Sequence, residues 1–170
     1  MLRIIGNGEQ KMMSNNKIES LIERARSLKK DKKSEISDSM TEKLEKELCV
    51  ILPNDFKVLC RFYGYDYFSY SQFYSFSDGV ILETKYWREQ ERLPNEYVVL
   101  SSDDASFELI KTISDQECKV IICDYQDFFN LCESGNFMYE TTTFNSFTDF
   151  YEFLLTEEES YRAESEGKSS

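Results

Sequence analysis

A chain of 170 residues is long enough for one domain with a single core, and its 41% apolar content argues against wholesale disorder. Residues 1–33 carry 9 Lys or Arg against 4 Asp or Glu, so residues 34–170 carry a net −17 within a total of −12, which disfavours binding to nucleic acid phosphates. The chain has no histidine, so both the commonest acid–base catalyst and the commonest transition-metal ligand are missing.

The sequence predicts a cytoplasmic protein without metal or other cofactor. No apolar run approaches the roughly 18 residues that a membrane span needs, and the N-terminus lacks the pattern of a signal peptide. The cysteines contain no Cys-x-x-Cys pair, and three lie in apolar runs, so we expect buried reduced thiols. They are Cys49, Cys60, Cys118, Cys123 and Cys132.

The N-terminal part is predicted as a disordered extension over residues 1–16, followed by two helices. Codons for the Gly-Glu pair at residues 8–9 can spell a ribosome-binding sequence, so we expect the natural start at Met12 or Met13 instead of Met1. The first helix runs from Lys17 to about Lys33, and its basic end is either a solvated helix terminus or a patch for nucleic acid or membrane. The second helix begins near residue 39 and turns Leu44 and Leu48 inward.

A short third helix is predicted after Leu52. Pro53 is placed at its first position, and Asp55 lies in the first turn, where the helix dipole favours a negative charge. Apolar residues follow with the i, i+3, i+4, i+7 spacing of a helix packed on a core, until a glycine ends it. They are Phe56, Leu59, Cys60 and Tyr63, and the glycine is Gly64.

The segment from residue 65 to 76 contains seven aromatic residues, and its last five residues predict a strand, Gln72–Phe76. Ser77 can cap a helix through Ile81, Leu82, Tyr86 and Trp87, although periodicity alone allows a strand at Val80–Leu82. Four strands are then expected, Tyr97–Ser101, Phe107–Thr112, Lys119–Asp124 and Phe137–Thr143.

The last predicted helix is capped by Ser146 and buries Phe147, Phe150, Tyr151 and Leu154, and an acidic tail over residues 157–170 is expected to be disordered. Together these elements predict an α+β fold, a single domain with a central mixed or antiparallel β-sheet packed by N-terminal helices and a C-terminal helix.

Three motifs carry a resemblance to a known family. They are Leu52–Gly64, Leu93-Pro94-Asn95-Glu96-Tyr97, and Asn145-Ser146-Phe147-Thr148-Asp149-Phe150. In this order and spacing they resemble the SUKH superfamily (Smi/Knr-like domain), which contains bacterial immunity proteins and a fungal cell-wall assembly regulator. The resemblance covers residues 40–155, within a predicted domain over residues 17–156. It also favours a helix over a strand at Val80–Leu82. A single glycine stands where the family usually has Asn-Gly or Gly-Gly.

The resemblance implies a non-catalytic immunity protein that binds a cognate toxin domain, very often a nuclease, and blocks its active site. A nuclease cleft is basic, so the strongly acidic body of this chain is the complementary surface. The expected partner-binding residues combine aromatic and acidic side chains near the middle of the chain. They are Tyr65, Asp66, Tyr67, Tyr70, Asp103, Asp104, Asp124 and Asp127.

Two alternatives remain open at this point. A regulator or scaffold similar to the fungal member would bind host proteins instead of a toxin. An enzyme could hold Mg²⁺ with Asp103, Asp104 and Glu108, although adjacent aspartates after a strand also fit a solvated turn, and no catalytic triad can be assembled without histidine.

Overall fold

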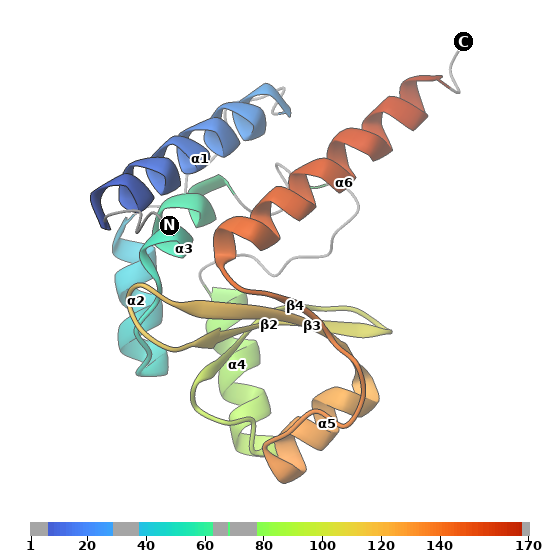
Figure 1. Ribbon diagram of the computed structural model, residues 1–170. Coiled ribbons are helices and arrows are strands. Elements are labelled where there is room, and N and C mark those ends of the chain that lie inside the picture. The colour runs from blue at the N-terminus through green and yellow to red at the C-terminus, as the bar shows by residue number, and fades with distance from the viewer. Residues whose placement is uncertain (1–6, 29–37, 63–67, 69–77, 168–170) are drawn as a thin grey trace, which may run out of the picture.

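The computed structural model describes residues 7–28, 38–62, 68 and 78–167 (Figure 1). In chain order the elements are α1 (Asn7–Leu28), α2 (Asp38–Leu48), α3 (Asn54–Leu59), the 3-10 turn η1 (Cys60–Phe62), α4 (Asp78–Glu91), β1 (Tyr97–Ser102), β2 (Ser106–Thr112), β3 (Cys118–Asp124), α5 (Tyr125–Ser134), β4 (Thr142–Phe144) and α6 (Phe147–Gly167). None of these helices is long and apolar enough to cross a membrane.

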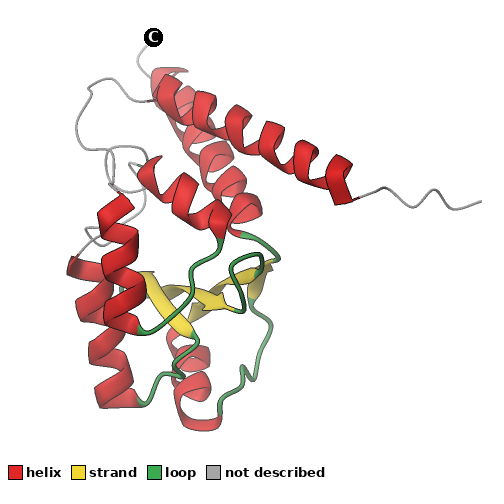
Figure 2. Ribbon diagram, turned by 90° about the vertical axis from the view of Figure 1, so that its left-hand side faces the viewer, coloured by secondary structure: helices red, strands yellow, loops and turns green. Residues whose placement is uncertain are grey.

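The four strands form one antiparallel sheet in the order β1-β2-β3-β4. Each strand alternates its side chains between two faces, and both faces are covered by helices. Figure 1 shows α1, α3 and α6 on one side of the sheet and α4 and α5 on the other, and Figure 2 shows helices above and below the sheet from a second direction. The predicted α+β fold is therefore confirmed, with a purely antiparallel sheet between two helical layers.

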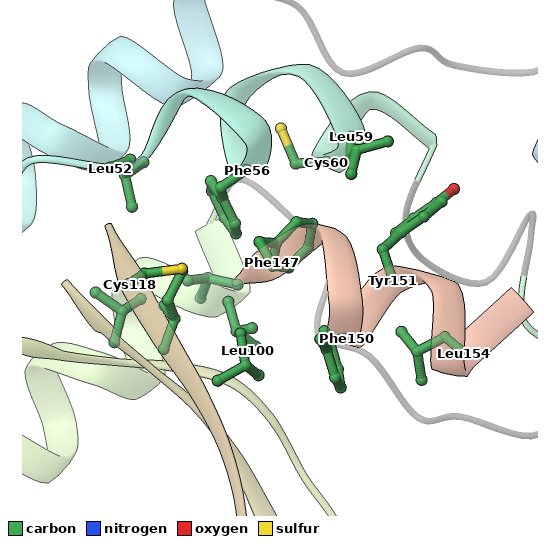
Figure 3. Packing of buried hydrophobic residues seen from close by; sticks show 14 of the residues in the cluster. Leu52, Phe56, Leu59, Cys60, Leu100, Cys118, Phe147, Phe150, Tyr151 and Leu154 are labelled. Carbon is green, nitrogen blue, oxygen red and sulfur yellow. The ribbon is translucent and has the colours of Figure 1, made fainter. Parts of the chain in front are cut away.

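The larger core lies between the sheet and the layer of α1, α3 and α6, and buried residues of α2 and α4 also belong to it. Phe56 of α3 meets Phe147 of α6 edge to face, with ring centroids 4.7 Å apart, and both side chains are fully buried (Figure 3). Val98 and Leu100 of β1 approach from the sheet. The predicted inward faces of α3 and α6 are thus correct for every described residue.

The smaller core lies between the opposite face of the sheet and α4 and α5. Phe107 of β2 stacks on Phe128 of α5 with ring centroids 3.7 Å apart. At the β1 edge, the buried backbone N–H of Val99 donates to Thr84 Oγ1 on α4 over 3.0 Å. Arg88, one turn further along α4, donates to the backbone carbonyl of Tyr97. Helix α4 therefore supplies two of the hydrogen bonds that a neighbouring strand would otherwise give to this edge.

Two predictions at helix N-termini were wrong in detail. The predicted disordered extension over residues 1–16 is helical from Asn7, and its residues 9–13 are the good helix formers Glu, Gln, Lys and Met. Helix α3 begins at Asn54, so Pro53 is its N-cap with extended backbone angles instead of its first helical residue.

The C-terminal tail was also predicted wrongly as disordered, since α6 continues to Gly167. The reason is a set of polar contacts with α1. Arg24 donates to both carboxylate oxygens of Glu159, at 3.0 and 2.8 Å. The fully buried Glu158 pairs with Arg162 at 2.6 Å, and Arg162 also donates to the carbonyl oxygen of Leu28. These contacts provide the order that apolar burial alone would not.

The remaining differences lie between β3 and α6. Helix α5 was not predicted, and the strand expected over Phe137–Thr143 is reduced to the three residues of β4. Four cysteines are buried as expected, whereas Cys49 is exposed, and none forms a disulfide. The predicted strand Gln72–Phe76, the cap at Ser77 and the basic end of the first helix lie outside the described residues.

Candidate functional site

One end of the sheet gathers three of the expected partner-binding carboxylates. Asp103 and Asp104 lie in the turn between β1 and β2, and Asp124 ends β3 directly opposite Ser106 of β2. All three aspartates are exposed. The pairing of β2 with β3 therefore brings together acids that are twenty residues apart in the sequence.

Asp103 also organises its own turn. Its Oδ1 accepts hydrogen bonds from the backbone N–H groups of Ala105 and Ser106, at 2.8 and 2.7 Å. The bond from Ala105 is the largest cause that lowers the pKa of Asp103 below its usual value, since it stabilises the charged carboxylate. The turn is thus held in a fixed shape with the second oxygen of Asp103 available to a partner.

Asp124 combines an exposed carboxylate with a structural contact. It is the N-cap of α5, and its Oδ1 accepts the backbone N–H of Asp127 at 2.8 Å. None of the ion pairs among the described residues involves Asp103, Asp104 or Asp124. Within the part of the chain that the structure describes, no ion pair neutralises these three charges.

Asp127, which was also expected in the partner-binding set, is buried and does not share the exposure of these three acids. Its side chain is only 2% exposed, and its Oδ1 accepts the backbone N–H groups of Met138 and Tyr139, both at 3.0 Å. Asp127 instead fixes the loop between α5 and β4 to the first turn of α5. The other four expected residues, Tyr65, Asp66, Tyr67 and Tyr70, lie outside the described residues.

Two of the three acids considered for Mg²⁺ binding, Glu108 and Asp103, have other partners. Glu108 accepts the hydroxyl of Ser101 at 2.8 Å, and Asp103 accepts the hydrogen bonds of its turn. Among residues 7–28, 38–62, 68 and 78–167, no three His, Cys, Asp or Glu side chains come together in a group that could hold a metal ion.

A feature that the sequence did not reveal lies beside these acids. Tyr86 and Trp87 of α4 and Tyr125 and Phe129 of α5 form a continuous row of rings, here called the aromatic strip. Ring centroids are 5.1 Å apart for Tyr86–Trp87 and 6.1 Å apart for both Trp87–Phe129 and Tyr125–Phe129. Tyr86 is 53% exposed and Tyr125 37% exposed. The strip begins at Tyr125, the residue that follows Asp124.

The strip was missed because α5 was missed. An Asp at position 124 with a second Asp three residues later, followed by Phe128, Leu131 and Cys132 at helical spacing, is the signal that predicts this helix. On α4 the helix itself was predicted, but Leu82 and Tyr86 were included in its periodic pattern and are exposed.

The comparison with known families covers most of the molecule. Residues 15–156 match the SUKH_5 model, which is described as SMI1-KNR4 cell-wall. A search of curated proteins gives no match. The matched region includes α3, the whole sheet and the N-terminal half of α6, and it contains all three motifs of the predicted resemblance. The chain therefore belongs to the SUKH_5 family of SMI1-KNR4 proteins, within the general class of immunity and SMI1-KNR4 proteins.

Proposed function

We propose that this protein is an immunity protein that neutralises a cognate toxin domain by covering its active site. The observation that carries the proposal is the group of exposed carboxylates of Asp103, Asp104 and Asp124 at one end of the sheet, without an ion-pair partner among the described residues. The carboxylates of an inhibitor can take the place of substrate phosphates on a basic protein, because both groups present charged oxygens to Arg and Lys.

The proposed toxin is a basic nuclease. A nuclease must attract a polyanion, so its cleft carries positive charge, and a protein whose residues 34–170 carry −17 associates with it rapidly. Blocking the cleft would prevent substrate binding without any chemistry by the immunity protein, in agreement with the general non-catalytic character of the family.

The test is co-expression with the toxin domain encoded beside this gene, in a host that the toxin kills. Survival of the host and recovery of a one-to-one complex from lysate are expected. The triple variant Asp103→Asn, Asp104→Asn, Asp124→Asn should protect less well at the same expression level, since Asn keeps the turn and cap hydrogen bonds but removes the charges. If the host dies and no complex forms, the immunity assignment is wrong.

A second candidate follows from the family description, which refers to the cell wall. In this alternative the protein is a regulatory scaffold that binds host proteins. The two functions are distinguished by the neighbouring genes and by affinity purification from the native host. A toxin gene directly upstream supports the immunity function, whereas stable association with cell-wall enzymes and no toxin gene supports the scaffold.

A further inference from the structure

The aromatic strip has two exposed rings, Tyr86 and Tyr125, and two half-buried rings, Trp87 and Phe129, and a layer of buried rings supports it from below. Trp87 contacts the buried Phe107 and Phe128, with centroid distances of 5.3 and 5.0 Å, and Tyr125 contacts Phe107 at 4.9 Å. Because Phe107 and Phe128 are fully buried and stacked on each other, the rings of Trp87 and Tyr125 that contact them are held in place. A preorganised aromatic surface loses little conformational entropy when a partner binds.

The strip extends along α4 beyond its rings. Leu82, one turn before Tyr86, is 65% exposed and shares its helix face. Figure 1 shows α4 and α5 together under the sheet, on the side opposite α1 and α6. The surface therefore joins two helices that are both anchored to the smaller core, and it leaves large apolar side chains in water.

Carboxylates lie at both ends of this surface. Asp124 precedes Tyr125 at the α5 end, where pairing of β2 with β3 also brings the turn of Asp103 and Asp104. Glu83 lies on α4 between Leu82 and Tyr86 and is half-buried. Among the described residues, none of these four acids forms an ion pair.

We propose that the aromatic strip with its flanking acids is the docking surface for a basic protein domain that presents arginine side chains. This inference rests on the proposed function and specifies where the partner binds. Guanidinium groups stack on aromatic faces and bind carboxylates through two parallel hydrogen bonds, so arginine satisfies both parts of the surface. Nucleic acids and anionic membranes are disfavoured as occupants, because their charge has the same sign as that of the surface.

The experiment uses the only tryptophan of the chain as a reporter, because Trp87 lies within the strip. The partner is the catalytically inactivated toxin domain from the co-expression test. Binding is expected to change the Trp87 emission, and Tyr86→Ala, Tyr125→Ala and Leu82→Ala should each raise Kd at least tenfold, mainly through the off-rate. Tyr161→Ala is the matched control, because Tyr161 is 52% exposed and belongs to α6, the helix that Figure 1 shows on the opposite side of the sheet. Circular dichroism confirms the fold of each variant.

The outcomes separate this proposal from the function on which it rests. If the complex forms but Kd stays within twofold in all three strip variants, the docking surface is wrong and the immunity function stands. If no complex forms, the immunity function is wrong, and the surface is tested with an octa-arginine peptide. A saturable change in Trp87 emission that is lost in the triple variant Asp103→Asn, Asp104→Asn, Asp124→Asn supports the surface, and an unchanged emission overturns it.

Discussion

Asp55 and Thr148 are 93 residues apart in sequence and are joined by two hydrogen bonds. One carboxylate oxygen of Asp55 accepts both the backbone N–H and the hydroxyl of Thr148, each at 2.9 Å, while the other accepts the backbone N–H of Phe56 at 2.8 Å. Asp55 therefore caps the first turn of α6 from outside that helix and connects two of the three family motifs.

Replacement of Asp55 by alanine should destabilise the fold. The variant leaves the N–H of Thr148 without its acceptor in a partly buried site, which costs about 1–3 kcal/mol. Asp55→Asn keeps an acceptor oxygen and should cost less. Urea unfolding followed by circular dichroism measures both values, and equal stability of wild type and Asp55→Ala would contradict the proposed role of this contact.

Phe56→Ala tests the core below α3. The side chain is fully buried against Phe147, so its truncation should cost about 3–5 kcal/mol through lost burial and the cavity that remains. Val58→Ala on the same helix is the control, since Val58 is 37% exposed, and it should cost far less. A decrease of less than ~1 kcal/mol in the free energy of unfolding of Phe56→Ala would show that α3 is not a core element.

Thiol labelling should distinguish one cysteine from the other four. Burial raises the pKa of Cys60, Cys118 and Cys123 to about 12 and that of Cys132 to about 11. These thiols are therefore protonated at pH 8 and shielded from reagent. Native protein should react with one equivalent of iodoacetamide, at the exposed Cys49, and unfolded protein with five.

The control for this experiment is Cys49→Ser, which should remove all fast labelling of the native protein. Rapid modification of two or more cysteines under native conditions would show that the smaller or the larger core opens readily.

The stability contribution of Asp103 should depend on pH in the acidic range. Hydrogen bonds, that from Ala105 first, lower the pKa of Asp103 in the folded protein below its unfolded value of 3.8. Its contribution is thus present above about pH 4 and is lost as the pH falls through the lower folded pKa. The difference in urea midpoint between wild type and Asp103→Asn should shrink between pH 5 and pH 2. Asp104→Asn, in the same turn, is the control and should show a smaller change.

Association with the toxin should depend on charge at the β1–β2 turn. Exposed carboxylates act over a Debye length of about 8 Å at physiological salt. They therefore raise the association rate more than they lower the dissociation rate. Asp103→Asn with Asp104→Asn should lower the on-rate several-fold at low salt and little at 0.5 M, with a smaller rise in the off-rate from the lost contacts with arginine. Surface plasmon resonance separates the two rates, and an unchanged on-rate at low salt would contradict electrostatic steering by these acids.

Local signals in the sequence predicted much of this fold. The Ser146 cap is confirmed by a 3.1 Å hydrogen bond from the N–H of Asp149, and strands β1, β2 and β3 agree with prediction within one residue at each end. Such features depend on residues that are near neighbours in the chain. Predictions failed where distant residues decide the outcome, as for α6 beyond residue 156, which depends on contacts from Arg24 of α1.

In the candidate site, too, features set by neighbouring residues could be predicted, and features set by distant residues could not. Exposure of Asp103, Asp104 and Asp124 follows from their positions in turns and strand ends. The burial of Asp127 does not, because it depends on two backbone N–H groups in the loop after α5. Similarly, the aromatic strip depends on how α4 packs beside α5, which no pattern within either helix specifies.

The contact between Thr84 and Val99 has a consequence for behaviour at high concentration. An open sheet edge is a template for intermolecular pairing and fibril growth, and at β1 that template is capped by a side chain of α4. Thr84→Val, which keeps the shape and removes the acceptor, would leave an unpaired N–H on a strand rich in valine. We expect this variant to form thioflavin-binding aggregates faster than wild type on storage, whereas Thr84→Ser would stay dispersed.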